Sequence, residues 1–210
     1  QMLYLSIHGL SDGHKTFHCG TRYDWYVIKK IPKYKDTCVS DEKHKEIRIN
    51  MSDFKWLPNY NIEGVKNILA KDDEERCEII QSMSSYEPRK AWMSNIYTEE
   101  YKYPCIHSTP KNGPIYKYSK RNDKGHFNVS KVIFGDSGIN TPIIDIDGKY
   151  GMTQHSMAIK IDDLETGEEL SKCLQSDKVK NLIDSCLYSS YAIDWNIFKD
   201  MKKDFWKGFI

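Results

Sequence analysis

Three residues in the second half of the sequence have types and a spacing that could support metal-dependent chemistry. Asp136, Asp147 and Lys149 form the pattern D-x10-D-x-K. In nucleases with this spacing, two carboxylates hold Mg²⁺ and the lysine helps to activate a water molecule. Asp147 is followed by Gly148, however, and Asp-Gly is typical of a hairpin turn. A magnesium-dependent, restriction-type endonuclease is therefore an alternative function and not the leading one.

Two further motifs imitate known chemistry but lack its partners. Gly135-Asp136-Ser137-Gly138 is similar to the nucleophile loop of trypsin-like proteases. That mechanism needs a histidine base held by a buried aspartate, and no histidine here has the matching Ala-Ala-His-Cys context. Four metal-binding side chains near the start of the sequence have a spacing that fits no tight zinc pattern. They are His8, His14, His18 and Cys19. We expect polar turns in both segments and no metal site.

Cationic and aromatic side chains alternate on predicted loops in the middle of the chain. Lysine, arginine and planar rings are the groups that bind a phosphate backbone and stack on bases. Lys90, Lys117, Lys120, Arg121 and Lys124 are expected to hold phosphates, and Arg121 can also pair with guanine. The full candidate set is Arg89, Lys90, Trp92, Lys117, Lys120, Arg121, Lys124 and His126. A solvated loop would have a similar composition, and that interpretation stays open.

Hydrogen-bonding side chains that could read base edges cluster between residues 131 and 160. Strand-like runs are interrupted there by polar connections, and Asn or Gln can pair bidentately with adenine. We expect the 120–128 loop and the 136–155 loops to enter the major groove. The candidate readers are Asn140, Tyr150, Thr153, Gln154 and His155.

The elements that must position these residues indicate an α+β fold. We expect a mixed or antiparallel sheet, flanking helices and a helical C-terminus. The acidic run 72–75 marks a boundary between residues 1–75, possibly the end of a catalytic α/β sheet plus a linker, and residues 76–210. The main expected elements are strands at 2–7, 23–31, 37–40, 46–51, 78–81, 101–106, 115–118, 131–134, 141–146 and 157–161, a turn-rich segment at 8–20, a helical turn at 87–93, and helices after Asn61, over 165–175, after Ser176 and in the tail.

The overall composition limits the possible partners and compartments. The 210 residues carry 31 basic and 30 acidic side chains, so an anionic partner would have to meet a local basic face. No stretch approaches the 18 or so apolar residues that a membrane span needs. The six cysteines show no Cys-x-x-Cys pair, and we expect reduced thiols of an intracellular protein. The first residues already look like a strand, as in a piece cut from a longer protein.

Several runs of this sequence resemble one family. They are GKYGMTQHSMAIKI (148–161), LSKCLQSDKVKNLIDSC (170–186), YAIDWNIFKDMKKDFW (191–206) and, further upstream, FHCGTRYDWYVIKK (17–30). The first three resemble the C-terminal target-recognition region of adenine-specific DNA methyltransferases of the type II restriction-modification kind, with TaqI-like specificity domains, as found in large DNA viruses. The fourth resembles the late strands of their catalytic domain.

The resemblance implies binding to double-stranded DNA, a catalytic methyltransferase domain as partner, and S-adenosylmethionine as cofactor of the parent enzyme. It also implies an intracellular location, in the host cytoplasm or a viral factory. The family's glycine-rich cofactor loop and its Asn/Asp-Pro-Pro-Tyr/Phe motif are absent, and Pro58-Asn59-Tyr60 is only superficially similar. We therefore expect DNA recognition without catalysis or a cofactor in this chain. A structural or virion protein derived from a recognition domain is a further alternative.

Overall fold

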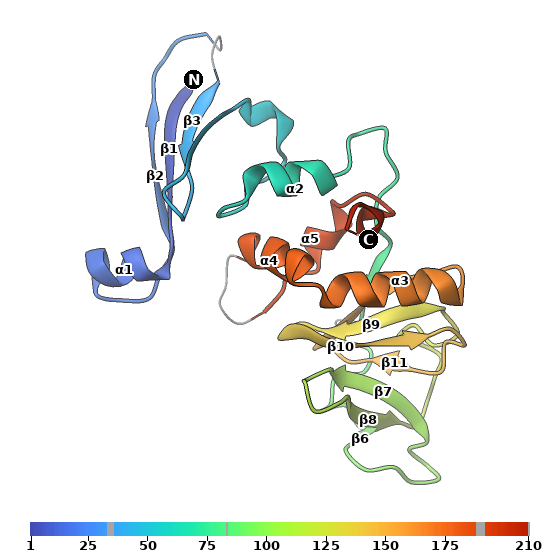
Figure 1. The fold of residues 1–210 in the computed structure, drawn as a ribbon. Helices are drawn as coiled ribbons and strands as arrows, with labels where there is room; N and C mark the ends of the chain where they lie inside the picture. Colours follow the sequence, from blue (N-terminus) through green and yellow to red (C-terminus); the bar gives the residue numbers. More distant parts are fainter. Residues whose placement is uncertain (33–35, 83, 188–191, 210) are drawn as a thin grey trace. The chain divides into compact units, whose positions relative to one another are not determined.

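A computed structural model describes residues 1–32, 36–82, 84–187 and 192–209 of the chain. The fold class is α+β, as predicted, with three sheets and a helical C-terminal region. The chain divides into two compact units (Figure 1). Unit 1 comprises Gln1–Asn67 and Asp184–Ser190, and unit 2 comprises Ile68–Ile183 and Tyr191–Ile210. The described residues 184–187 thus belong with unit 1, although they follow most of unit 2 in the sequence.

Unit 1 contains a four-stranded sheet in the order β2-β1-β3-β4. Strands β1 and β3 are parallel, and the other neighbours are antiparallel. The predicted strand pairs are confirmed, but the turn-rich expectation for residues 8–20 is wrong, since a helix forms there. The elements are β1 (Met2–His8), α1 (Leu10–Phe17), β2 (Tyr23–Ile28), β3 (Thr37–Ser40), β4 (Glu46–Ile49), η1 (Met51–Asp53) and α2 (Ile62–Ile68).

The inner strands of this sheet are buried, whereas the edge strand β2 is exposed. Val39 of β3 is fully buried and packs with Leu5, Ile7 and Ile49. In contrast, β2 lies at the edge of the sheet and is exposed along nearly its whole length, including Trp25. An exposed run of large apolar side chains on an edge strand is uncommon in a monomeric protein.

Unit 2 is built from two four-stranded sheets, in the orders β10-β9-β12-β5 and β11-β7-β8-β6. Alternating side chains explain how they pack, because Ile133 and Ala158 of one sheet meet Ile106 and Met152 of the other. The strands are β5 (Ile79–Gln81), β6 (Met93–Ser94), β7 (Tyr103–Ser108), β8 (Ile115–Ser119), β9 (Lys131–Gly135), β10 (Gly138–Asp145), β11 (Gly151–Met152) and β12 (Ser156–Lys160).

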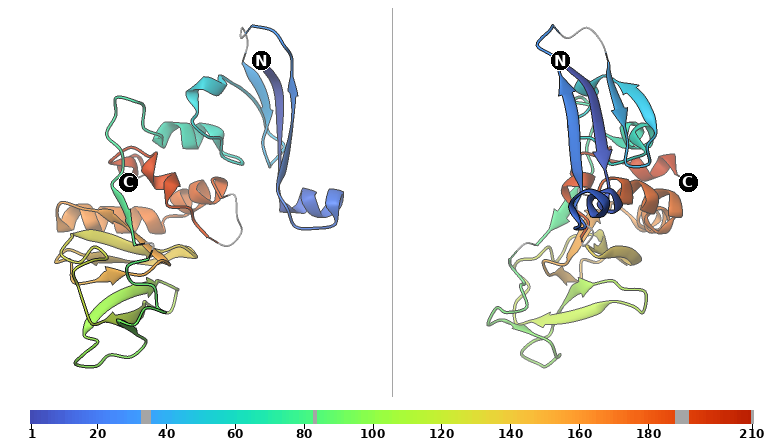
Figure 2. Two further views of the ribbon diagram at one scale, coloured as in Figure 1. Left: turned by 180° about the vertical axis from the view of Figure 1, so that it is seen from behind. Right: turned by 90° about the vertical axis from the view of Figure 1, so that its left-hand side faces the viewer.

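The helices of unit 2 cover the outer face of the first sheet. Helix α3 lies on β9 and β10, while β7 and β8 lie on the opposite side, which makes three layers (Figures 1 and 2). The ring of Phe198 packs at a tilted angle against that of Phe134 of β9, with the centroids 5.3 Å apart. Ser176 caps the helix that follows it, as predicted, through its side chain and Val179 N (3.3 Å). The helices are α3 (Leu164–Gln175), α4 (Asp177–Ser185, which ends in unit 1), α5 (Asn196–Lys199) and η2 (Phe205–Gly208).

In the segment 131–160, the hairpin forms at a different turn from the one predicted. The sequence predicted it at Asp147-Gly148. Asp147-Gly148 does form a turn, with Gly148 at φ +66°, but it leads from β10 to β11 in the other sheet. The antiparallel hairpin is instead made by β9 and β10 around Asp136 and Ser137. The expected helical turn at 87–93 is a pair of successive reverse turns.

Candidate functional site

Four polar side chains from three neighbouring chain connections meet at one end of the two sheets of unit 2. We call His107, Asp136, Thr153 and His155 the strand-end cluster. His107 lies near the end of β7, Asp136 follows β9, and the other two lie between β11 and β12. Strand β11 runs parallel to β7, with Met152 opposite Ile106. The residues that follow these two, Thr153 and His107, therefore also lie next to each other.

Hydrogen bonds fix both imidazole rings of the strand-end cluster through the same ring nitrogen. His155 Nδ1 lies 3.0 Å from Asp136 Oδ2, and the amide of Asp136 donates to the carbonyl of His155 (3.1 Å). His107 Nδ1 lies 2.9 Å from Thr153 Oγ1. The ring centroids of the two histidines are 5.2 Å apart, with the rings almost perpendicular. Both rings are therefore held side by side, each through Nδ1.

Burial and charge differ between the members of the strand-end cluster. Thr153 is fully buried, whereas the side chain of His155 is 49% exposed. Burial lowers the pKa of His107, and the positive charge of Lys117 and the neighbouring His155 lower it further, against an opposing effect of Asp136. The ring of His107 is consequently neutral at pH 7.

The predicted base readers occupy different positions. His155 is exposed, and Asn140 is partly exposed on β10. Thr153 is fully buried, and its hydroxyl bonds His107 Nδ1 (2.9 Å), so its base-reading role stays a prediction that burial counts against. Gln154 accepts a bond at its carbonyl from Gln81 Nε2 (3.5 Å). The side-chain oxygen of Gln154 is buried and has no hydrogen-bond partner in the described part of the chain.

Tyr150 lies immediately before β11 and makes none of the hydrogen bonds of the strand-end cluster. Its ring is 5.9 Å from that of Tyr116, and its amide donates to Asp145 Oδ2 (3.0 Å). Burial and the neighbouring Tyr150 raise the pKa of Tyr116. Tyr150 is thus part of the packing between strands and only partly exposed.

The predicted cationic residues lie around aromatic rings, and most are paired with acidic or polar groups. Lys90 and Arg121 both lie over Trp92, at 5.8 and 5.4 Å from the ring centroid. Lys120 lies over Tyr101 and bonds Glu100 (2.6 Å). The other pairs are Arg89 with Glu87, Arg121 with Asp123, and Lys117 with Asn95.

Residues 121–127 are held in place by Tyr86. The fully buried Tyr86 donates to the carbonyl of Arg121 (3.2 Å) and accepts from the amide of Lys124 (3.2 Å). Gly125, at φ +68°, lies against the same ring. His126 bonds the carbonyl of Gln81 (3.2 Å). The backbone of residues 121–127, which we call the basic loop, is therefore fixed by these hydrogen bonds, and Arg121 and Lys124 project from it. His126 attaches the loop to Gln81.

The residues of the nuclease alternative do not converge. Asp136 precedes β10 and Asp147 follows it, so the eight residues of the strand separate them. At about 3.3 Å per residue, the strand puts roughly 25 Å between its two ends. Lys149 pairs with Asp147 (2.6 Å), and both are exposed. Asp136 and Asp147 therefore cannot hold one metal ion.

The other imitated motifs also lack their chemistry. Among the described residues, no three His, Cys, Asp or Glu side chains are placed to hold a metal ion. His8 Nε2 hydrogen-bonds Ser6 Oγ in unit 1, His8 Nδ1 lies 3.4 Å from Asp12 Oδ2, and Cys19 is exposed. In the protease-like motif, it is Asp136 that pairs with a histidine, while Ser137 points to no partner among the described residues. The six cysteines are all free thiols.

His107 is the member of the strand-end cluster that the sequence did not predict. Its only signal is that it follows a predicted strand (101–106) just before the polar Ser108-Thr109. The pairing of Asp136 with His155 depends on how two separate turns meet, and no local pattern carries that information.

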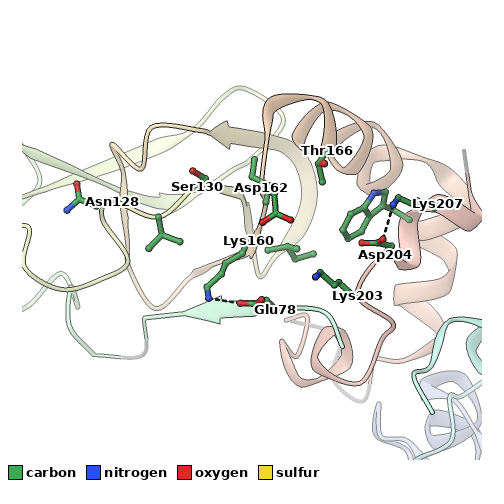
Figure 3. Close-up of a pocket in the computed structure, with 13 residues that line it drawn as sticks. Glu78, Asn128, Ser130, Lys160, Asp162, Thr166, Lys203, Asp204 and Lys207 are labelled. Atoms are coloured by element: carbon green, nitrogen blue, oxygen red, sulfur yellow. Dashed lines mark hydrogen bonds and ion pairs between the residues drawn. The ribbon is translucent and has the colours of Figure 1, made fainter. Parts of the chain in front are cut away.

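A cavity of about 550 Å³ lies elsewhere in unit 2, beside the start of α3 (Figure 3). Its three lysines are each paired with an acid: Lys160 with Glu78 (2.5 Å), Lys203 with Glu75 (3.2 Å) and Lys207 with Asp204 (2.8 Å). The cationic groups are thus already neutralised, and we assign this cavity no ligand. Within the described ranges, no helix combines the length and the hydropathy that a membrane crossing needs.

No protein-family model matches this chain, and no curated protein is significantly similar to it.

Proposed function

We propose that this chain recognises double-stranded DNA in a sequence-specific way. In this proposal it is the specificity part of an S-adenosylmethionine-dependent DNA methyltransferase and lacks the catalytic motifs itself. The observation that carries the proposal is the strand-end cluster, which combines an exposed, anchored histidine with the tips of several strands. Polar side chains on such tips can reach base edges while the sheets behind them stay rigid.

The cationic and aromatic residues supply the sequence-independent part of the proposed interface. Lys90 and Arg121 share the face of Trp92, and Lys120 lies over Tyr101. Lysine and arginine there would hold phosphates, and Tyr86 keeps the 121–127 loop ordered for that purpose. The acidic partners of these residues would have to be displaced by phosphate on binding.

The exposed β2 strand supports a catalytic methyltransferase domain as the partner. Tyr26 and Ile28 are each about three-fifths exposed, at 59% and 60%, on an edge strand of unit 1. A sheet continued by further strands would pair this edge and cover its apolar side chains. Unit 1 would then be the last part of a larger catalytic sheet, and the cofactor would be bound by that larger sheet.

Selection of bound sequences from random duplexes tests the proposal. We expect one enriched motif and no cut ends. Cut ends would instead support the endonuclease, and the absence of any enrichment would support a structural protein. Replacing Lys117 or Lys120 by alanine should lower the slope of log affinity against log salt by about one unit. A base-reader change such as His155→Ala should alter the preference between sequences and leave that slope unchanged.

A further inference from the structure

The hydrogen bonds of the strand-end cluster determine which ring nitrogen carries the proton in each histidine. The carboxylate of Asp136 can only accept, so Nδ1 of His155 must carry the proton that lies between them. In the neutral ring, Nε2 of His155 is then a hydrogen-bond acceptor. No described residue bonds this Nε2, and the side chain is 49% exposed.

In His107, the buried hydroxyl of Thr153 places the ring proton on the other nitrogen, Nε2. Thr153 Oγ1 already accepts from the amide of His155 (3.4 Å). The hydroxyl proton of a fully buried threonine needs an acceptor, and within the described ranges the only one bonded to it is Nδ1 of His107. The proton of the neutral His107 ring therefore lies on Nε2, which is a donor.

We infer that His107 and His155 form one donor–acceptor pair that binds the edge of an adenine. This inference rests on the proposed DNA recognition and names the base that the site reads. In the major groove, adenine presents the acceptor N7 beside the amino donor at N6, which complements the donor on His107 and the acceptor on His155. Both rings are held through Nδ1, and their centroids are 5.2 Å apart, so the pair is arranged before the base arrives.

The test uses the full chain and the duplex motif selected from random sequences. At each adenine of the motif, one duplex carries 7-deazaadenine, which lacks N7, and another carries purine, which lacks the amino group. At one position we expect each change to weaken wild-type binding about tenfold. His107→Leu should lose the response to 7-deazaadenine only, and His155→Leu should lose the response to purine only. His14→Leu, at an exposed histidine of α1, should respond like the wild type.

Asp136→Ala tests the same inference without a change in the buried groups. It frees the ring of His155 to take either tautomer, so the preference for adenine over guanine should fall while binding to unrelated duplexes does not. If no motif is selected at all, the proposed function and this inference both fail. A motif whose adenines respond identically in the wild type and both leucine variants would overturn the inference alone.

Discussion

At the scale of single residues, the least expected feature is a buried ion pair at the end of β9 and β10 that lies opposite the Asp136 turn. Lys131 is fully buried, and its ammonium bonds Asp145 Oδ2 (2.6 Å) and the carbonyl of Val129 (3.0 Å). Asp145 also accepts from the amides of Lys149 (2.7 Å) and Tyr150 (3.0 Å). One carboxylate thus holds both the lysine and the turn that leads into β11.

Removing this carboxylate should be costly. Asp145→Ala leaves a buried ammonium and two backbone N–H groups without their acceptor, and we expect unit 2 to lose about 3–5 kcal/mol of stability. Urea unfolding measures the change. Asp147→Ala is the matched control, because its ion pair with Lys149 is exposed and should contribute less than about 1 kcal/mol. Equal losses in the two variants would contradict this account.

The same pair should make stability depend on alkaline pH. Burial lowers the pKa of Lys131 from its usual 10.5, against the opposing effect of Asp145, so the unfolded chain binds this proton more tightly than the folded chain. Stability from this residue therefore rises as the pH increases through its folded-state pKa. Compared with Lys131→Met, the wild type should gain stability as the pH rises from the lowered folded-state pKa of Lys131 towards the usual 10.5 of the unfolded chain. A difference that stays constant in paired urea titrations would refute the expectation.

At the scale of elements, the basic loop depends on one contact between a glycine and a tyrosine. A Cβ on Gly125 would lie 1.9 Å from Tyr86 Cε2, and its φ of +68° disfavours any other residue. We expect Gly125→Ala to destabilise unit 2 by about 2–4 kcal/mol, from backbone strain and displacement of the ring. Gly113→Ala is a useful comparison, since φ is +105° there but no atom lies within 4 Å of the added Cβ. Thermal unfolding should show the larger loss for Gly125→Ala.

The acidic partners of the lysines should restrain DNA binding. Lys120 is paired with Glu100 in the free protein, and the ion pair raises the pKa of Lys120. Glu100→Gln should strengthen duplex binding by a few-fold at low salt, because the lysine no longer exchanges one anion for another. The gain should disappear in the Lys120→Ala background. Fluorescence anisotropy at several salt concentrations measures both effects, and weaker binding by Glu100→Gln would contradict the assigned phosphate role.

The sequence predicts an element well when residues within that element determine its structure, and poorly when contacts with distant residues do. The β3–β4 hairpin, the helix after Ser176 and the strand at β9 follow from alternation, capping and apolar runs. Helix α1 was not predicted, because many of its residues are typical of turns. A tertiary contact, the close packing of Gly13 against the backbone of Thr21, lies in this helix and has no signal in the local sequence. After Asp147-Gly148 the chain enters β11, which pairs with β7 in the other sheet. That pairing depends on how the two sheets pack, and the residues of the turn do not predict it.

At the scale of the whole molecule, the proposal predicts DNA binding that is separate from catalysis. Incubation of the chain with labelled S-adenosylmethionine and duplexes that contain its selected motif should transfer no methyl groups. The reason is the absence of the glycine-rich loop and of the Asn/Asp-Pro-Pro-Tyr/Phe motif from the 210 residues. Methyl transfer by this chain would disprove the division of labour, even if duplex binding were found.

The candidate site shows the same limit at this scale. Residue types on polar connections indicated Asp136 and His155, but their pairing, the contribution of His107 and the burial of Thr153 arise only when β7, β9 and β11 are assembled. Likewise, the separation of Asp136 from Asp147 follows from the extended β10 strand that lies between them and cannot be inferred from the spacing of the motif.

The open edge of unit 1 has a practical consequence. In the part of the chain that the structure describes, β2 has a neighbouring strand on one side only, and its exposed residues include Trp25 and Ile28. Such an edge is a template for adding a strand from another molecule. If the proposed function holds, two chains joined there would double the number of DNA sites per particle and raise the apparent avidity without any change in a single site. Affinities and selected motifs for this protein are therefore best compared at concentrations where light scattering shows a single monomeric species.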